Sequence, residues 1–135
     1  MLNHQNKRPS VLLADDDSLL RAMLKLILRS ENYPVLGEVA NGEDAVTQFA
    51  KLKPDLLLLD INMPKMDGLQ VLEAIHRSDP DAMVMMVSAD ATMDRVTVAL
   101  SLGAVGFVVK PFNPASVLNR IEHCCKERGW IWQSS

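Results

Sequence analysis

The sequence predicts an α/β domain in which five helices cover a doubly wound, five-stranded parallel sheet. Five short apolar runs alternate along the chain with five amphipathic segments, each about 10 to 14 residues long. Most of the runs are continuously apolar, which is typical of strands that helices cover on both faces. The chain has 135 residues, 48% of them hydrophobic, which suffices for one domain with a packed core.

The first elements follow from apolar spacing and capping residues. Strands are expected at residues 11–14, 35–39, 56–59, 83–87 and 105–109. The first helix follows Asp17, a suitable N-cap. The second begins at Asn41, with Asp44 three residues on in a variant of the capping box.

The later helices have clear stop signals. The third follows Gly68 and stops before the Asp-Pro pair at 79–80, and the fourth runs from about residue 92 to 102 and ends at Gly103. Apolar residues at helical spacing are expected to face the core: Leu19, Leu20, Met23, Leu24, Ile27 and Leu28, then Ala45, Val46, Phe49 and Leu52, then Leu69, Leu72 and Ile75, then Met93, Val96, Ala99 and Leu100, and finally Val117, Leu118 and Ile121.

The last helix is expected to start with Asn113 as its cap and Pro114 as its first residue, and to end near Gly129. It carries the adjacent cysteines Cys124 and Cys125. A disulfide between sequence neighbours is strained, so we interpret them as reduced thiols of a cytosolic helix, one buried and one exposed.

Composition excludes several classes of protein. Lys plus Arg number 14 against 17 Asp plus Glu, and this net charge of -3 lacks the basic excess of a nucleic-acid binder. No apolar run reaches the length of about 18 residues needed to span a membrane, and residues 1–10 lack the apolar core of a signal peptide. We therefore expect a cytoplasmic protein: a disordered N-terminal tail at 1–8, one domain at 9–129 and a C-terminal tail at 130–135.

Polar residues collect where the predicted strands end. They are Asp15, Asp16 and Asp17, then residues 60–64 beginning with Asp60, then Ser88, Ala89 and Asp90, and finally Lys110 and Pro111. Carboxyl ends of parallel strands share one edge, so at least three carboxylates, a hydroxyl and an ammonium should converge. Crowded carboxylates favour a bound cation, and an all-oxygen ligand set favours Mg²⁺ or Mn²⁺. The three histidines lie elsewhere, which disfavours zinc.

Taken singly, most of these residues have simpler interpretations: a helix cap for Asp17, solvated loop acids for Asp15 and Asp16, a cap or loop hydroxyl for Ser88 and a surface amine for Lys110. Asp60 is harder to explain in this way, because it ends an apolar strand where a bare carboxylate is costly. A flavin site of the kind found in related sheets is excluded, since three consecutive aspartates after the first strand would repel a phosphate.

In combination these residues resemble the receiver domain of two-component response regulators, over residues 9–128. In length the chain is similar to the single-domain chemotaxis type. The motifs that carry the resemblance are the acidic pair at 15–16, Asp-Ile-Asn-Met-Pro-Lys-Met-Asp-Gly at 60–68, Ser-Ala at 88–89 and Lys-Pro-Phe at 110–112. The resemblance implies the flavodoxin-like strand order 2-1-3-4-5.

The resemblance also implies roles for individual residues. Asp60 would accept a phosphoryl group. Mg²⁺ (or Mn²⁺ in its place) would be bound by Asp15, Asp16, Asp60 and the carbonyl of Asn62, with Asp15 acting through a metal-bound water. The transferred group would be contacted by Lys110, Ser88 and the N–H of Ala89, and Gly68 would open the third helix. The family's peptide bond at Lys110–Pro111 is cis.

The output implied by the resemblance is a two-state switch. Ser88 and Phe107 would switch the face formed by the fourth helix, fifth strand and fifth helix, while Asn62 and Asp90 would set the lifetime of the phosphoryl group. Phe107 stands where the family often has tyrosine, and a plain core phenylalanine is the alternative. The implied partners are a sensor histidine kinase or histidine phosphotransfer protein and a downstream effector, with the chain a monomer or weak dimer.

Two other functions remain to be separated from self-phosphorylation. One is a phosphorylation-independent interaction module, although such a module usually lacks an acid or the lysine. The other is a phosphatase with an aspartyl intermediate, which generally needs a second acid where Asn62 stands. Trp130 and Trp132 have three interpretations: packing against the last helix, a partner contact, or the start of a further domain. We favour packing.

Overall fold

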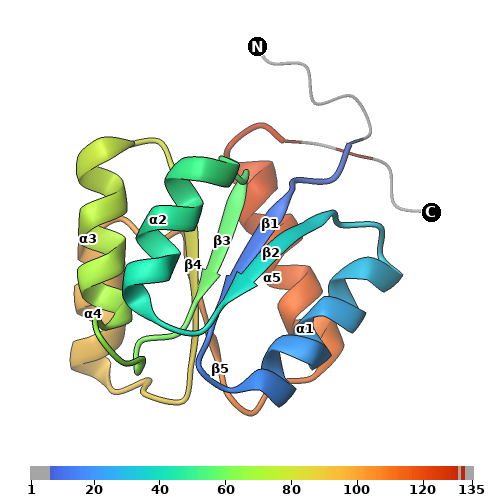
Figure 1. Cartoon of the computed structure of the whole chain (residues 1–135). Coiled ribbons are helices and arrows are strands. Elements are labelled where there is room, and N and C mark those ends of the chain that lie inside the picture. Colours follow the sequence, from blue (N-terminus) through green and yellow to red (C-terminus); the bar gives the residue numbers. More distant parts are fainter. Residues whose placement is uncertain (1–6, 131, 133–135) are drawn as a thin grey trace.

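The computed structural model describes residues 7–130 and residue 132 (Figure 1). Five strands form one sheet in the order β2-β1-β3-β4-β5, and every neighbouring pair is parallel. The strands are β1 (Val11–Ala14), β2 (Val35–Val39), β3 (Leu56–Leu59), β4 (Met83–Ser88) and β5 (Gly106–Val109). The predicted fold class and strand order are confirmed.

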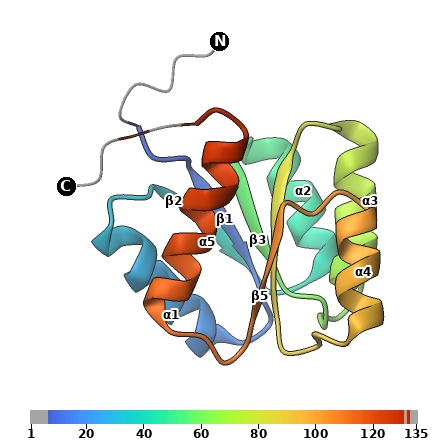
Figure 2. The ribbon, with the colours of Figure 1, turned by 180° about the vertical axis from the view of Figure 1, so that it is seen from behind.

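Helices cover both faces of this sheet (Figures 1 and 2). They are α1 (Ser18–Ser30), α2 (Gly42–Leu52), α3 (Gly68–Ser78), α4 (Met93–Ser101) and α5 (Pro114–Glu127). Helices α1 and α5 pack on one face, and α2, α3 and α4 pack on the other.

The alternation of side chains along each strand explains the continuous apolar runs. Leu58 and Met85 point into the cluster with α1 and α5, whereas Leu57 and Met86 point into the cluster with α2, α3 and α4. Because both faces are buried, every position of β1, β3 and β4 is buried. The three central strands therefore have a core on each side, and their polar side chains stand only where the strands end.

Apolar residues cover a wider part of the surface of helices α1 and α4 than the part that is buried against the core. Leu19 is 70% exposed and Met93 is 80% exposed, and Met23 and Leu100 are also exposed. Their expected core positions are wrong, because a helix on the outside of a sheet buries only one stripe of its surface. The strand ends also differ slightly from expectation, since β4 includes Ser88 and β5 begins at Gly106 rather than Val105.

Helix caps follow the expected residues with one difference. The side chain of Asn41 accepts a hydrogen bond from the N–H of Asp44 at 2.8 Å and also donates to the Asp44 carboxylate. The second hydrogen bond of this capping box therefore joins two side chains, whereas in a standard capping box it joins a side chain to the backbone N–H of the cap residue. A full capping box forms at α3, where Asp67 and Gln70 satisfy each other's backbone N–H groups. The Asp-x-x-Gln pattern was a signal for it in the sequence.

Both cysteines are buried, so the expectation of one exposed thiol is wrong. The thiol of Cys124 donates to the carbonyl of Val105, and it lies so close to Gly106 that a Cβ there would be 3.0 Å from Sγ. At the C-terminal end of α5, the backbone N–H of Trp130 donates to the carbonyl of Cys125 at 2.9 Å. The residue before β5 and the segment after α5 therefore both contact the last turns of α5.

The segment after α5 packs into the core, as we favoured. The indole N–H of Trp130 donates to the carbonyl of Lys7 at 2.8 Å, and Trp132 makes an edge contact with Tyr33 at a centroid distance of 5.8 Å. Both tryptophans belong to the cluster formed with α1 and α5. The rest of the two expected tails, residues 1–6, 131 and 133–135, lies outside the described residues.

Among the residues that the structure describes, no helix has both the length and the apolar character required to cross a membrane.

Candidate functional site

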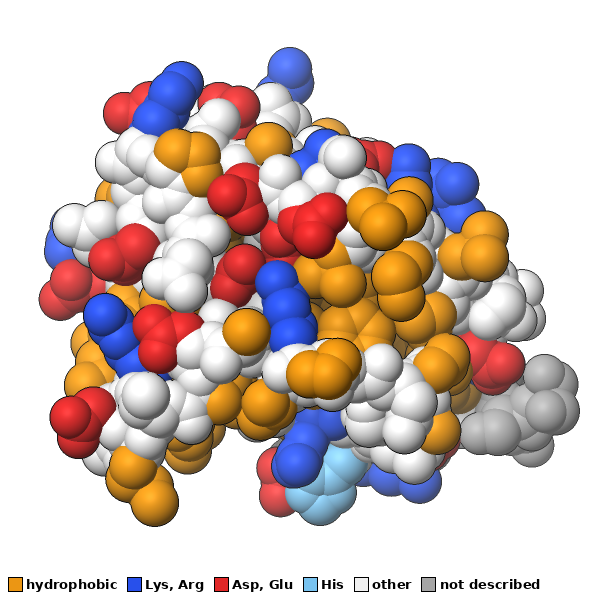
Figure 3. Space-filling view, turned by 90° about the horizontal axis from the view of Figure 1, so that it is seen from below, with side chains coloured by type: hydrophobic (Ala, Val, Ile, Leu, Met, Phe, Trp, Pro, Cys, Tyr) orange, Lys and Arg blue, Asp and Glu red, His pale blue; other side chains and the backbone are white. Residues whose placement is uncertain are grey.

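Three polar or charged side chains stand out in the buried interior of the described chain. Asp15 is 2% exposed, Asp60 is 6% exposed and Ser88 is fully buried. They come from the ends of β1, β3 and β4, at what we call the carboxyl edge of the sheet. Figure 3 views the molecule from this side and shows acidic side chains gathered beside a hydrophobic area.

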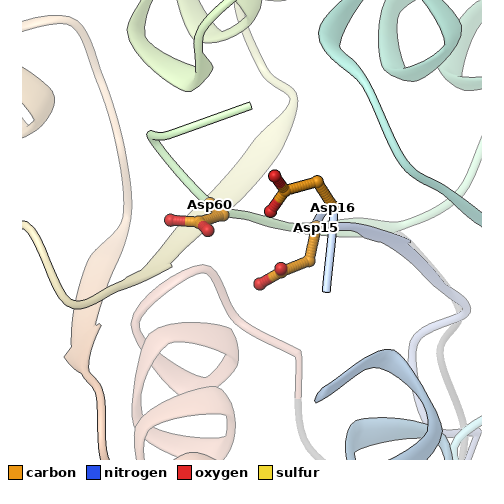
Figure 4. Close-up of side chains that lie close together, drawn as sticks. All are labelled: Asp15, Asp16 and Asp60. Carbon is orange, nitrogen blue, oxygen red and sulfur yellow. The ribbon is translucent and has the colours of Figure 1, made fainter. Parts of the chain in front are cut away.

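The predicted acidic cluster is present. One carboxylate oxygen from each of Asp15, Asp16 and Asp60 lies within 4.8 Å of the others, with Asp16 exposed and the other two buried (Figure 4). Three carboxylates this close repel one another unless a cation offsets their charge. The donors are all oxygens, so the residues fit a hard divalent cation such as Mg²⁺.

Lys110 supplies part of the offsetting charge. Its Nζ donates to Oδ2 of Asp15 at 2.8 Å and to Oδ2 of Asp60 at 3.0 Å. Burial disfavours the charged ammonium, but the hydrogen bonds and the negative charges of the two carboxylates together outweigh that effect, so the pKa of Lys110 is raised. Lys110 is positioned by its backbone, because its N–H donates to the carbonyl of Ser88 and so extends the pairing of β4 with β5. The Lys110–Pro111 peptide bond is cis, as expected.

Each buried carboxylate divides its oxygens in the same way. Oδ2 accepts from Lys110, while Oδ1 of Asp15 accepts from the N–H of Asp17 and Oδ1 of Asp60 accepts from the N–H of Ile61 at 2.7 Å. Burial raises the pKa of Asp15, against the opposing effects of the Lys110 and Asp17 hydrogen bonds. Both carboxylates are thus held in place before any ligand arrives.

The remaining predicted residues occupy different positions around the cluster. Ser88 Oγ accepts from the N–H of Asp90 at 3.2 Å, and the Asp90 carboxylate lies 3.4 Å from Nε of Arg95 on α4. Asn62 is exposed on the loop after β3. Phe107 is half-buried and packs against the α2–α3–α4 cluster. Asp17 is the N-cap of α1, which agrees with its interpretation as a helix cap.

Two glycines hold the loop between β3 and α3 against its neighbours. The N–H of Gly68 donates to the carbonyl of Ile61, and a Cβ at Gly68 would lie 2.1 Å from the carbonyl oxygen of Asp60. A Cβ at Gly42 would lie 1.9 Å from the carbonyl oxygen of Met66. The contact at Gly68 holds the backbone of Asp60 against the start of α3, and the contact at Gly42 holds the loop against α2.

A groove next to Lys110 was missed by the sequence reasoning. It encloses about 330 Å³ and is lined by Leu20, Met23, Ala89, Lys110, Pro111 and Phe112. The missed signal is on α1, where apolar residues cover more of the helix circumference than one core-facing stripe needs. The groove places an apolar surface directly beside the acidic cluster.

Replacing Lys110 with methionine is expected to strengthen Mg²⁺ binding while weakening the metal-free fold. The ammonium competes with a divalent cation for the negative charge of Asp15 and Asp60, and its loss leaves two buried carboxylates without their counter-ion. Urea unfolding in EDTA should show a loss of about 2 kcal/mol, and a Mg²⁺ titration a lower Kd. The matched variant Lys126→Met, at an exposed lysine of α5, should change neither. A Lys110→Met protein with weaker Mg²⁺ binding would contradict this account.

Comparison with known proteins adds an independent line of evidence. A family model described as the response regulator receiver domain matches residues 11–122. The chain is 39% identical to the chemotaxis protein CheY of Thermotoga maritima, over 86% of this chain and 97% of that protein. It is 40% identical to CheY of Listeria monocytogenes, over 86% and 98%.

Solved structures give the same result. The chain resembles a protein in the crystal structure of the CheX–CheY–BeF3–Mg complex from Borrelia burgdorferi, with a TM-score of 0.83 and 37% sequence identity. The match covers 84% of this chain and 87% of that one.

Proposed function

The chain belongs to the response regulator receiver domain family of two-component signalling, and from this premise we propose that it accepts a phosphoryl group on Asp60. The observation that supports this most directly is the environment of Asp60. It is a buried carboxylate of the acidic cluster, with one oxygen accepting from a backbone N–H and the other from Lys110. A nucleophile held in this way needs little reorganisation before attack.

In the proposed transfer, an oxygen of Asp60 forms the new P–O bond as the P–N bond of a partner's phosphohistidine breaks, and the leaving imidazole keeps its electron pair. The transition state is loose and spreads charge over the phosphoryl oxygens. Lys110 moves a hydrogen bond from Asp60 to one of these oxygens, and Ser88 Oγ and the N–H of Ala89 donate to others. All three donors lie at the carboxyl edge of the sheet before transfer.

We propose that Asp15, Asp16 and Asp60, with the backbone carbonyl of Asn62, hold Mg²⁺, for which Mn²⁺ can substitute. When bound, the ion supplies positive charge that offsets the carboxylates and the phosphoryl oxygens. Asp15 would act through a water rather than directly, as the family resemblance implies.

The proposed output is a shift of the α4–β5–α5 face. Ser88 gives up its contact with the N–H of Asp90 when it turns to the phosphoryl group, the loop into α4 follows, and Phe107 moves into the vacated space. Exposed apolar residues on this face, Met93, Leu100 and Val109, support its use as a contact surface for an effector.

Ser88→Ala is expected to keep phosphoryl uptake and to lose most of this coupling. Alanine cannot donate to the phosphoryl group, whereas Asp60 and Lys110 are untouched. In wild-type protein, backbone amide shifts on phosphorylation should extend from Asp60 into α4 and β5. In the variant they should stay around Asp60. The control Ser78→Ala removes an exposed hydroxyl on α3 and should behave as wild type. Full propagation in Ser88→Ala would show that the hydroxyl is not the link.

The donor in this proposal is a protein, a sensor histidine kinase or histidine phosphotransfer protein. The groove of Leu20, Met23 and Phe112 supports this, because it offers apolar contact area next to Lys110, where a donor must approach. We further propose that Asn62 and Asp90 tune hydrolysis of the acyl phosphate, since both residues stand on loops at the carboxyl edge. Two free buried thiols support a reducing, cytoplasmic setting.

The proposal is tested by incubating the protein with acetyl phosphate and Mg²⁺ and following its mass. A receiver gains one phosphoryl group, which peptide mapping should place on Asp60, and loses it slowly by hydrolysis. A phosphorylation-independent module gains none, and a phosphatase consumes the donor steadily without accumulating the modified form. Either of these last two results would overturn the proposed function.

A further inference from the structure

A single arginine ties the loop after β1 to the neighbouring strand β2. Arg21, on α1, has a side chain that is only 16% exposed. Its Nη1 donates to the backbone carbonyl of Asp15 at 2.6 Å, and its Nε donates to Oε1 of Glu38 at 2.7 Å. Glu38 also pairs with Lys25, one turn further along α1. The fork of the guanidinium suits this task, because its donors diverge from a rigid plane.

The hydrogen bond to the Asp15 carbonyl completes the restraint of that residue. The N–H of Asp15 donates to the carbonyl of Val39 at 3.1 Å, and its two carboxylate oxygens accept from Asp17 and Lys110. Every polar atom of Asp15 therefore has a partner. Its carbonyl belongs to the peptide group that joins it to Asp16, so Arg21 fixes the plane of that peptide.

This peptide plane decides where Asp16 points. Asp16 is exposed, and none of the hydrogen bonds found among residues 7–130 and 132 restrains its carboxylate. Its oxygen nevertheless lies within 4.8 Å of those of Asp15 and Asp60. Because no hydrogen bond restrains this side chain, the backbone sets the direction of its Cα–Cβ bond and therefore which positions its carboxylate can reach.

We propose that Arg21 is a positioning residue for the divalent-cation site, holding the Asp15–Asp16 peptide so that Asp16 faces Asp15 and Asp60. The inference rests on the proposed function only in that the acidic cluster binds Mg²⁺. Charge alone gives the opposite expectation, because a guanidinium next to a cation site repels the cation. Glu38 offsets that charge, and hydrogen bonds from Lys25 and Arg21 hold the pKa of Glu38 below its usual value.

A positioning role and simple charge repulsion predict opposite changes in the Kd for Mg²⁺ when Arg21 is replaced, so the direction of the change separates them. Mg²⁺ alone is titrated into each protein, and the backbone amide shifts of Asp16 and Ile61 give the Kd. For Arg21→Met we expect a Kd about tenfold higher, the size typical when a residue that orients a metal ligand is lost. Arg21→Lys keeps the charge and one donor, and it should recover part of the affinity.

Lys25→Met is the matched control. It removes the same charge from the same helix and from the same carboxylate, but Lys25 pairs with Glu38 and not with Asp15. Its Kd should stay within about twofold of wild type or fall slightly. Urea unfolding in EDTA is measured in parallel, because a purely structural role would lower stability and leave the Kd of the folded protein unchanged.

An unchanged Kd, or tighter Mg²⁺ binding by Arg21→Met, would overturn the positioning role while leaving the proposed function intact. If wild-type protein shows no Mg²⁺-dependent shifts at all, the metal site of the proposed function fails, and the role of Arg21 fails with it. A higher Kd for Arg21→Met with an unchanged Kd for Lys25→Met would establish it.

Discussion

Asp60→Asn is expected to abolish phosphoryl uptake from acetyl phosphate while leaving the fold intact. An amide lacks the anionic oxygen that attacks phosphorus, so the loss should be complete rather than partial. The structural cost is small because two effects oppose each other. The substitution removes one anion from a crowded cluster, and it leaves one contact with Lys110 or Ile61 unmet. Stability should stay within about 1 kcal/mol of wild type.

The same variant should bind Mg²⁺ at least about tenfold more weakly, because it would lose one of the three carboxylates proposed to hold the ion. Mass measurement after incubation with donor and Mg²⁺ checks the first expectation, and a Mg²⁺ titration checks the second. The matched control is Asp81→Asn, at an exposed aspartate just before β4 on the opposite edge of the sheet, which should take up phosphate normally. Uptake by Asp60→Asn at the wild-type rate would mean that another side chain is the acceptor.

Gly68→Ala is expected to lower the free energy of unfolding by about 3 kcal/mol and to impair uptake as well. The added Cβ would lie 2.1 Å from the carbonyl oxygen of Asp60 and 2.8 Å from Cα of Ile61. Both are backbone atoms at the end of a buried strand, so neither can move aside by rotating a side chain. Helix α3 and the Asp60 backbone must separate, and the carboxylate moves with them.

Gly37→Ala makes a matched control for that substitution. Its Cβ would meet only the ends of two leucine side chains, the nearer being Leu52 Cδ1 at 3.2 Å, which can shift by a rotamer adjustment. Urea unfolding followed by circular dichroism should therefore show a change of less than about 1 kcal/mol. Equal losses in the two variants would contradict the close packing of α3 against Asp60.

The fold was predictable because burial on both faces leaves a direct mark on the sequence. A strand such as Leu56–Leu59 has no solvent side, so its apolar run is unbroken and its ends are sharp. The exposed residues of α1 and α4 were not predictable in the same way. Leu19 and Met93 are apolar and at helical spacing, but spacing does not say how much of a helix its neighbours cover.

The acidic cluster was predictable for a topological reason, since parallel strands bring their carboxyl ends to one edge whatever the details of packing. The contacts that fix its geometry were not. Nothing local in the sequence pairs Arg21 with the Asp15 carbonyl or with Glu38, seventeen residues away. A charged residue on an amphipathic helix is usually solvated, and only the three-dimensional arrangement gives it partners on two other elements.

The packing of Trp130 and Trp132 determines what an optical experiment on this protein can see. Both indoles lie with Lys7 and Tyr33 at the edge where strands begin, and the guanidinium of Arg8 stands 5.5 Å from the ring of Trp132. Intrinsic fluorescence should thus report the melting of the whole domain and stay almost silent when the acidic cluster is ligated. A ligand titration that relies on tryptophan emission would miss binding that is truly there.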